Sequence, residues 1–255
     1  MGNQYSWLVS PDKMIINGVS SDTVGLTVDT PPMPPLAEEI VDEAFTFGRA
    51  ESTVFKTGQY KNIEIAVKCY VLDYGYQPDQ IYKYISGAKT LAFSSDDRYF
   101  YKVKKVLSVT PAYQGKGKNV LNVRFQCSPF KYNAINPEYT YTIPDGETSG
   151  TAQIYNAGSV YCEPMIWMAA RVIGSGTSGV ITVNGETVTI IPATSGEVYF
   201  DIPNMEVYTL VGGTPTALQS SVSGKWWEFI LPPGYSEISW SGGTAIKITK
   251  NERWL

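Results

Sequence analysis

The stretch from Asn62 to Val71 reads NIEIAVKCYV, and it decides the fold class. Apolar residues stand at every second position from Ile63 onward, and mostly polar residues stand between them. Because side chains alternate between the two faces of a β-strand, this pattern predicts a strand with one buried face. The stretch from Asn119 to Cys127 (NVLNVRFQC) repeats the pattern, and we expect another strand from Tyr99 to Leu107. The chain is therefore predicted to be mainly β.

One short helix is expected near residues 78–86. Pro78 suits the first helical turn, and Gly87 suits the position just past the last turn. Between them, Ile81, Tyr84 and Ile85 fall on one face at helical spacing. A helix of about two to three turns with a single apolar face is expected to lie on a sheet.

The second half of the chain has short strands separated by Gly-rich turns. Asn184-Gly185, a dipeptide that two-residue turns favour, predicts a hairpin from Val180 to Ile191. Its buried residues are expected to be Ile181, Val183, Val188 and Ile190. Residues 238–240 and 246–248 are expected to form another hairpin around the turn at residues 241–244. Short strands at regular spacing predict an antiparallel sandwich.

A domain boundary is expected between Asn133 and Gly150, where turn and linker signals gather. A chain of 255 residues is long enough for two domains. We therefore divide it into an N-terminal β domain, residues 1–135, and a C-terminal sandwich, residues 136–255.

The segment from Asp29 to Tyr60 interrupts the strand pattern. Its run TPPMPP, residues 30–35, cannot be a central strand because proline has no N–H to donate to a neighbouring strand. Long excursions of this kind are often interface elements, although a plain loop is an equally open interpretation. The residues that we consider candidates for contact with another copy of the chain are Pro31, Pro32, Met33, Pro34, Pro35, Leu36, Phe45 and Phe47.

The residues needed for common enzyme chemistry are missing. Without any histidine, the chain cannot use Ser-His-Asp or Cys-His catalysis or a His-dependent metal site. Cys69, Cys127 and Cys162 are far apart and odd in number, so we interpret them as reduced core thiols. A glycosidase would need two paired carboxylates, and the acidic residues show no pairing in the sequence. We expect no enzyme, no cofactor and no metal site.

The charge and aromatic content favour contacts with other proteins. The net charge is −4 and no basic cluster is present, so nucleic-acid binding is not expected. The sequence has no apolar run of about 18 residues, so we expect no membrane helix, and its first residues do not resemble a signal peptide. Charged residues make up only 17%, while Tyr and Trp number 18 and 6. Both aromatic types are common at protein interfaces.

The adjacent Trp226 and Trp227 are the candidates for contact with a glycan or a partner. Exposed aromatic rings can stack on sugar rings. Consecutive residues of a strand face opposite sides, so at most one of the two should be exposed. Packing in the core or at an interface is the competing interpretation.

Several passages follow one another in a recognisable order along almost the whole chain. Residues 15–19 (IINGV) open it, and the expected helix runs into LAFSSDD at residues 91–97. The first half closes on Pro129-Phe130. The second half opens on Asn156-Ala157-Gly158 and ends with LPPG at residues 231–234 and a strand through Trp240. In this order the passages resemble the distal tail protein of long-tailed, siphovirus-type phages and prophages of Gram-positive bacteria.

This resemblance implies an all-β fold with one short helix. Residues 1–135 would form a ring domain, sandwich-like or split-barrel-like, that closes into a homohexamer, and residues 136–255 a galectin-like antiparallel sandwich that projects outward. The protein would be a structural part of the virion tail tip or baseplate, made in the host cytoplasm. Its partners would be the tail tube protein and the tail hub or fibre protein, and the outward domain can hold a receptor-binding protein. The alternative function is a carbohydrate-binding sandwich module for host cell-wall glycans.

Overall fold

A computed structural model describes residues 12–45, 47–48, 50–71, 78–114, 118–143, 147, 149–170, 178–191 and 196–255. The chain separates into two compact units between Ala134 and Ile135. Nearly all of the regular structure is β, and α1 (Pro78–Ser86) is the single α-helix of the described residues. The prediction of an all-β chain with one short helix is confirmed.

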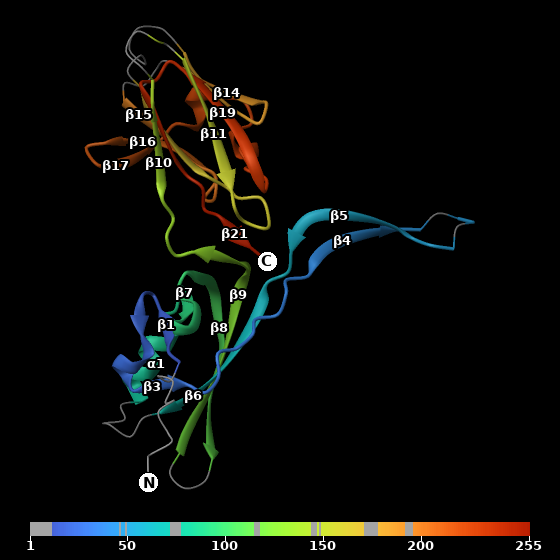
Figure 1. The fold of residues 1–255 in the computed structure, drawn as a ribbon, viewed down its shortest axis with the longest axis vertical. Coiled ribbons are helices and arrows are strands. Elements are labelled where there is room, and N and C mark those ends of the chain that lie inside the picture. The colour runs from blue at the N-terminus through green and yellow to red at the C-terminus, as the bar shows by residue number, and fades with distance from the viewer. Residues whose placement is uncertain are drawn as a thin grey trace, which may run out of the picture. The chain divides into compact units, whose positions relative to one another are not determined.

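The N-terminal unit is built on one antiparallel sheet with the strand order β2-β1-β7-β8-β9-β6-β3 (Figure 1). The strands of this unit are β1 (Met14–Ile16), β2 (Val19–Ser20), β3 (Leu26–Val28), β4 (Glu39–Ala44), β5 (Thr53–Tyr60), β6 (Ile63–Val71), β7 (Thr90–Phe93), β8 (Tyr99–Gln114) and β9 (Lys118–Asn133). Strands β6 and β9 pair with Ile63 opposite Cys127 and Cys69 opposite Leu121. Their alternating residues face one core, as the period of two predicted.

The two ends of this sheet come together around the short 3₁₀ helix η1 (Ser21–Val24). The buried Ser21 hydroxyl accepts a hydrogen bond from Met14 N at 3.2 Å and donates one to Leu26 O at 3.0 Å. The backbone N–H of Val28 also donates to the carbonyl oxygen of Asp12, at 2.8 Å. Because β1 and β3 stand near opposite ends of the strand order, these bonds curl the sheet into a partly closed barrel.

Helix α1 packs against the core of this barrel. Ile81 and Ile85 are buried, and the predicted helix over residues 78–86 is confirmed at both ends. The half-buried Tyr84 phenol accepts a hydrogen bond from Ile16 N at 3.2 Å and lies 3.0 Å from Met14 O. The helix is thus tied to β1 by a polar contact as well as by its apolar face.

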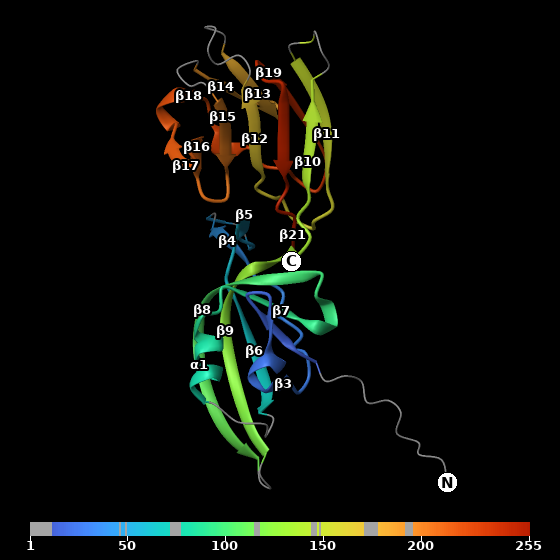
Figure 2. The ribbon, with the colours of Figure 1, turned by 90° about the vertical axis from the view of Figure 1, so that its left-hand side faces the viewer.

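The C-terminal unit is a sandwich of two antiparallel sheets, which Figure 1 shows side by side and Figure 2 shows turned by 90°. One sheet has the order β10-β20-β12-β15-β16-β17 and the other β11-β19-β13-β14-β18. The strands of these sheets are β10 (Glu138–Thr142), β11 (Ser149–Asn156), β12 (Met165–Ala170), β13 (Gly179–Val183), β14 (Glu186–Ile190), β15 (Gly196–Asp201), β16 (Glu206–Val211), β17 (Thr214–Ala217), β18 (Val222–Ser223), β19 (Gly234–Ser241) and β20 (Ala245–Thr249). The short strand β21 (Arg253–Trp254) belongs to neither sheet.

The hairpin predicted around Asn184-Gly185 is confirmed. Strands β13 and β14 pair with Val183 opposite Glu186, and both turn residues have positive φ angles of 49° and 92°. Such angles are those that a two-residue hairpin turn requires. The four residues predicted to share its buried face lie in the core: Ile181, Val183, Val188 and Ile190.

The hairpin predicted around residues 241–244 is wrong. Strands β19 and β20 belong to different sheets, so the chain crosses the sandwich there instead of turning back on itself. Gly243 permits this corner, because a Cβ atom at that position would lie 2.8 Å from Met168 Cγ. The local sequence identified the turn but not the sheet to which each strand belongs.

The three cysteines are free and fully buried, as expected for reduced core thiols. Burial raises the pKa of Cys69, of Cys127 and of Cys162 to about 12. In the unfolded chain each thiol would ionise near its ordinary pKa of 9.0. Below pH 9 the thiols therefore have no effect on the pH dependence of stability. Above it, stability falls as the pH rises towards 12.

We expect the N-terminal unit to lose stability between pH 9 and 11, by at most about 1.4 kcal/mol per pH unit for each of its two thiols. Urea unfolding followed by far-UV circular dichroism at several pH values will measure this slope. The control is the Cys69→Ala, Cys127→Ala variant, which should be less stable at pH 7 but should show a shallower slope. An unchanged slope would mean that other groups cause the alkaline loss.

Neither a membrane-crossing helix nor a metal centre is evident in the described part of the chain. None of its helices has the length and apolar character that crossing a membrane requires. No three His, Cys, Asp or Glu residues there are grouped so that they could hold a metal ion.

Candidate assembly surface

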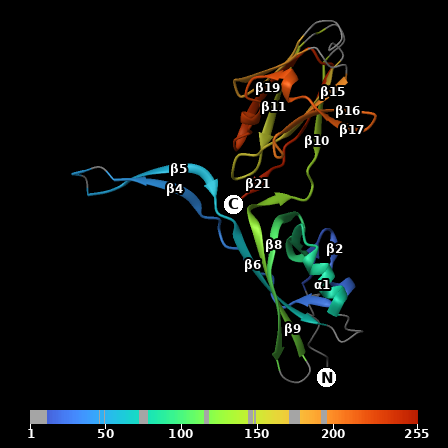
Figure 3. The same cartoon turned by 180° about the vertical axis from the view of Figure 1, so that it is seen from behind.

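The segment from Asp29 to Tyr60 ends in a pair of strands, which the prediction of an excursion that interrupts the strand pattern did not include. Strands β4 and β5 form an antiparallel hairpin with Glu39 opposite Tyr60 and Ala44 opposite Thr53. Figure 3 shows this hairpin, which we call the arm (residues 39–60), as a thin ribbon leading away from the barrel sheet. The prolines end before β4 begins, so they exclude a strand only from the first part of the segment.

A bulge bends the arm near its base. The register shifts between Ile40 and Val41, where β5 has two extra residues, Thr57 and Gly58. Gly58 has a φ of 72°, in the left-handed region that favours glycine, and the Thr57 hydroxyl donates to Ile40 O at 2.5 Å. Thr57 and Gly58 therefore form a bulge inside β5 and do not end the strand.

The arm exposes apolar side chains on both strands and at its tip. Phe45 and Phe47 are fully or almost fully exposed, at 81% and 106%, and Val54 and Phe55 are about half exposed. In the described part of the chain, no further strand pairs with β4 or β5. A lone two-stranded hairpin is at best marginally stable in water. A bare hairpin with exposed phenylalanines is therefore suited to lie against another molecule.

The proline-rich run separates into a face against the barrel and a face towards solvent. Pro31, Pro32 and Pro34 line a small hollow of about 180 Å³ that Phe93 and Tyr99 also border. Met33 and Leu36 point away from it and are 95% and 77% exposed. The structure thus brings Met33, Pro35 and Leu36 to the surface at the base of the arm, while Phe45 and Phe47 lie at its tip.

The two adjacent tryptophans differ in their exposure to solvent. Trp226 is buried in the sandwich core, whereas Trp227 is 44% exposed. They lie in a 3₁₀ turn, η4 (Trp226–Glu228), and not in a strand as the alternation argument assumed. Trp227 borders an open hollow of about 650 Å³ together with Tyr161, Ile230 and Pro232. Of the predicted pair, only Trp227 is placed to contact another molecule.

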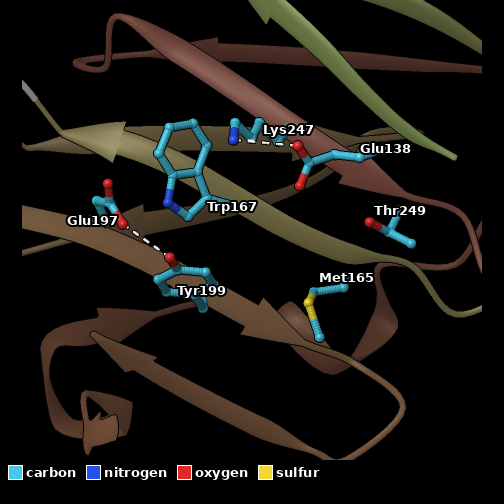
Figure 4. Close-up of a pocket in the computed structure, with 7 residues that line it drawn as sticks. All are labelled: Glu138, Met165, Trp167, Glu197, Tyr199, Lys247 and Thr249. Atoms are coloured by element: carbon cyan, nitrogen blue, oxygen red, sulfur yellow. Dashed lines mark hydrogen bonds and ion pairs between the residues drawn. The ribbon is translucent and has the colours of Figure 1, made fainter. Parts of the chain in front are cut away.

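A second aromatic surface on the sandwich was not predicted. The outward face of the sheet that contains β12 has a hollow of about 280 Å³ between Trp167, Tyr199, Lys247 and Glu138 (Figure 4). In the strand pairing, Trp167 lies opposite Lys247 on one side and Tyr199 on the other. Trp167 alternates with buried Ile166 and Met168 along β12, and that alternation was the available signal.

Comparisons with known proteins place the fold. No protein-family model and no curated protein matches this sequence. Among solved structures, the Dit protein of phage SPP1, described as a paradigm of the hub adsorption apparatus in phages infecting Gram-positive hosts, matches with a TM-score of 0.70 at 15% identity. The match covers 96% of this chain and 99% of that one. A chain of the phage P2 baseplate in its activated, Ca-containing conformation matches with a TM-score of 0.51 at 10% identity, over 95% and 98% of the two chains.

Proposed function

We propose that this chain is a structural protein of a phage tail tip that closes with copies of itself into a hexameric ring. The ring would connect the tail tube protein to the tail hub or fibre protein, within the baseplate of the virion. The C-terminal sandwich would face outward and hold a receptor-binding protein. This role requires surfaces and no catalytic chemistry.

The observation that carries this proposal is the chain-long match to the SPP1 Dit fold. The match runs over both units in the same chain order and leaves almost no residue of either protein uncovered. A shared sandwich alone would cover only residues after Ile135, where the second unit begins. The N-terminal barrel with its single helix is therefore part of the likeness, in keeping with the distal tail family that the sequence resembles.

The arm supports ring closure. In a ring the same two different surfaces meet at every contact, one from each neighbour. The arm offers one such surface, since its exposed phenylalanines have no partner within the described part of their own unit. We propose that it lies across the N-terminal unit of the next copy, with Met33, Pro35 and Leu36 at its base contributing to the same contact.

Native mass spectrometry and negative-stain electron microscopy of the purified full chain test the ring. We expect a particle six times the mass of the 28.1 kDa chain, seen as single-layer rings. A tail tube subunit would instead stack into long polymers. Long tubes, or a chain that stays monomeric at high concentration and with tube protein added, would contradict the proposal.

A further inference from the structure

The hollow beside Trp167 has the side chains of a small polar binding site. Strands β10, β20, β12 and β15 place its residues in rows across the sheet. One row runs from Lys247 through Trp167 to Tyr199, and Glu138 lies opposite Thr249 in the next. The residues that alternate with them along these strands are buried in the core: Ile166, Met168, Val198, Phe200, Ile246 and Ile248. The outward side chains therefore stand on a well-packed base.

Internal contacts hold these side chains in place. Lys247 Nζ lies 3.2 Å from Glu138 Oε1 and 4.7 Å from the centre of the Trp167 ring. The Tyr199 phenol donates a hydrogen bond to Glu197 at 2.9 Å, and its ring stacks on Tyr208 with a centroid distance of 5.0 Å. In Figure 4 the indole nitrogen of Trp167 points towards the same phenol. A ligand would meet groups that are already oriented, which reduces the entropy lost on binding.

We propose that this hollow binds one ring of a neutral sugar. A pyranose has an apolar C–H face, which suits the face of the Trp167 indole that Lys247 does not cover, and hydroxyl groups around its edge. A carboxylate can accept about four hydrogen bonds, so Glu138 and Glu197 keep free acceptor positions for those hydroxyls. Lys247 supplies donors, and the Thr249 hydroxyl can donate or accept.

The size and charge of the hollow narrow the class of sugar. A volume of about 280 Å³ is just below the usual range for ligand sites, and it suits one ring at the end or branch of a glycan. Two carboxylates against one ammonium give the lining a net charge of −1, from Glu138, Glu197 and Lys247. A phosphate-bearing polymer would be repelled, whereas an uncharged hexose or N-acetylhexosamine would not.

Titration of the ¹⁵N-labelled full chain with glucose, galactose and N-acetylglucosamine tests this site, with glycerol phosphate as the anionic probe. We expect a saturable shift of the Trp167 indole N–H signal with at least one of the three sugars and none with glycerol phosphate. Trp167→Ala should weaken binding at least tenfold, as measured from the backbone amide signals of β12 and β15. The matched control Tyr235→Ala, which removes an exposed aromatic residue from β19 in the other sheet, should leave the affinity unchanged.

Tyr199→Phe keeps the aromatic ring and removes only its hydroxyl group. It therefore tests the site without opening a cavity in the protein. We expect binding to weaken several-fold while the thermal unfolding midpoint stays close to that of the wild type. Three results would each overturn the proposal. They are no saturable shift with any of the sugars, binding that survives Trp167→Ala, and binding that is lost in Tyr235→Ala instead. None of these results bears on ring formation.

Discussion

Lys250→Met is expected to lower the free energy of unfolding of the C-terminal sandwich by about 3–5 kcal/mol, because it leaves a buried carboxylate without its partner. The side chains of Lys250 and Glu252 are only 8% and 9% exposed, and Lys250 Nζ lies 2.5 Å from Glu252 Oε1. Lys250 Nζ also donates to Tyr155 O at 2.7 Å, and Glu252 accepts a hydrogen bond from Ala157 N at 2.9 Å. The pair thereby ties residues 250–252 to the last residues of β11 and to Ala157, which follows that strand.

The pKa of Lys250 determines how the stabilisation from the Lys250–Glu252 pair changes with pH. Burial lowers this pKa, but the hydrogen bond and the charge of Glu252 outweigh burial and raise it above its ordinary value of 10.5. A lysine with a raised pKa stabilises the fold fully below its ordinary pKa, and this stabilisation is lost as the pH rises above it. The pair should therefore stabilise the sandwich at every pH from neutral to about 10.

Urea unfolding followed by tryptophan fluorescence measures this loss. All tryptophans except Trp7 lie at or beyond Trp167, so the signal reports mainly on the sandwich. The matched control is Lys225→Met, which breaks an exposed pair with Glu228 and should cost less than about 1 kcal/mol. The double variant Lys250→Met, Glu252→Gln should recover part of the loss, since neither charge then remains buried. Equal losses of unfolding free energy in Lys250→Met and Lys225→Met would contradict the prediction, because they would show that water reaches the Lys250–Glu252 pair.

Replacing Phe45 and Phe47 with serine is expected to weaken contact between copies by about 10²–10⁴-fold. Burying a phenylalanine side chain contributes about 1.5–3 kcal/mol, so two at one contact contribute about 3–6 kcal/mol. Neither residue belongs to the barrel core, so the fold of the N-terminal unit should be unchanged. Native mass spectrometry should then find monomers at concentrations where the wild type forms rings.

The control for this variant is Tyr82→Ser, which changes an exposed aromatic residue on α1 outside the arm. Rings that persist in the Phe45→Ser, Phe47→Ser variant would show that the arm does not hold neighbouring copies together. Deleting residues 30–36 should also weaken the ring, but it is a less selective test. It removes most of the chain that connects β3 to β4 and the prolines that line the hollow beside Phe93.

Several features could be predicted because they depend on residues close together in the sequence. The alternation in Ile63–Val71 and in Asn119–Cys127 requires a strand with one buried face, whichever strands lie beside it. Both ends of helix α1 could be predicted, because Pro78, Gly87 and the apolar residues between them lie within about three helical turns of one another. The Asn184-Gly185 hairpin depends on the φ angles of two residues.

The candidate site could be predicted only in part. The sequence identifies Phe45 and Phe47 as candidates but not the hairpin that carries them, because prolines exclude a strand only where they stand and indicate nothing about the residues that follow. The surface around Trp167 was missed for a different reason. Its members come from β10, β12, β15 and β20, and only the pairing of these strands brings Glu138, Tyr199 and Lys247 together.

The sequence alone determined four features: the β class, the single helix, the burial of the cysteines and the lack of histidine chemistry. Each of them depends on composition or on local spacing. Tertiary structure decided which sheet each strand joins, as at β19 and β20, and which of Trp226 and Trp227 is exposed. It also decided that residues 39–60 form a bare arm. Hydrogen bonds between strands far apart in the sequence set these features, and no local pattern encodes which strands will pair.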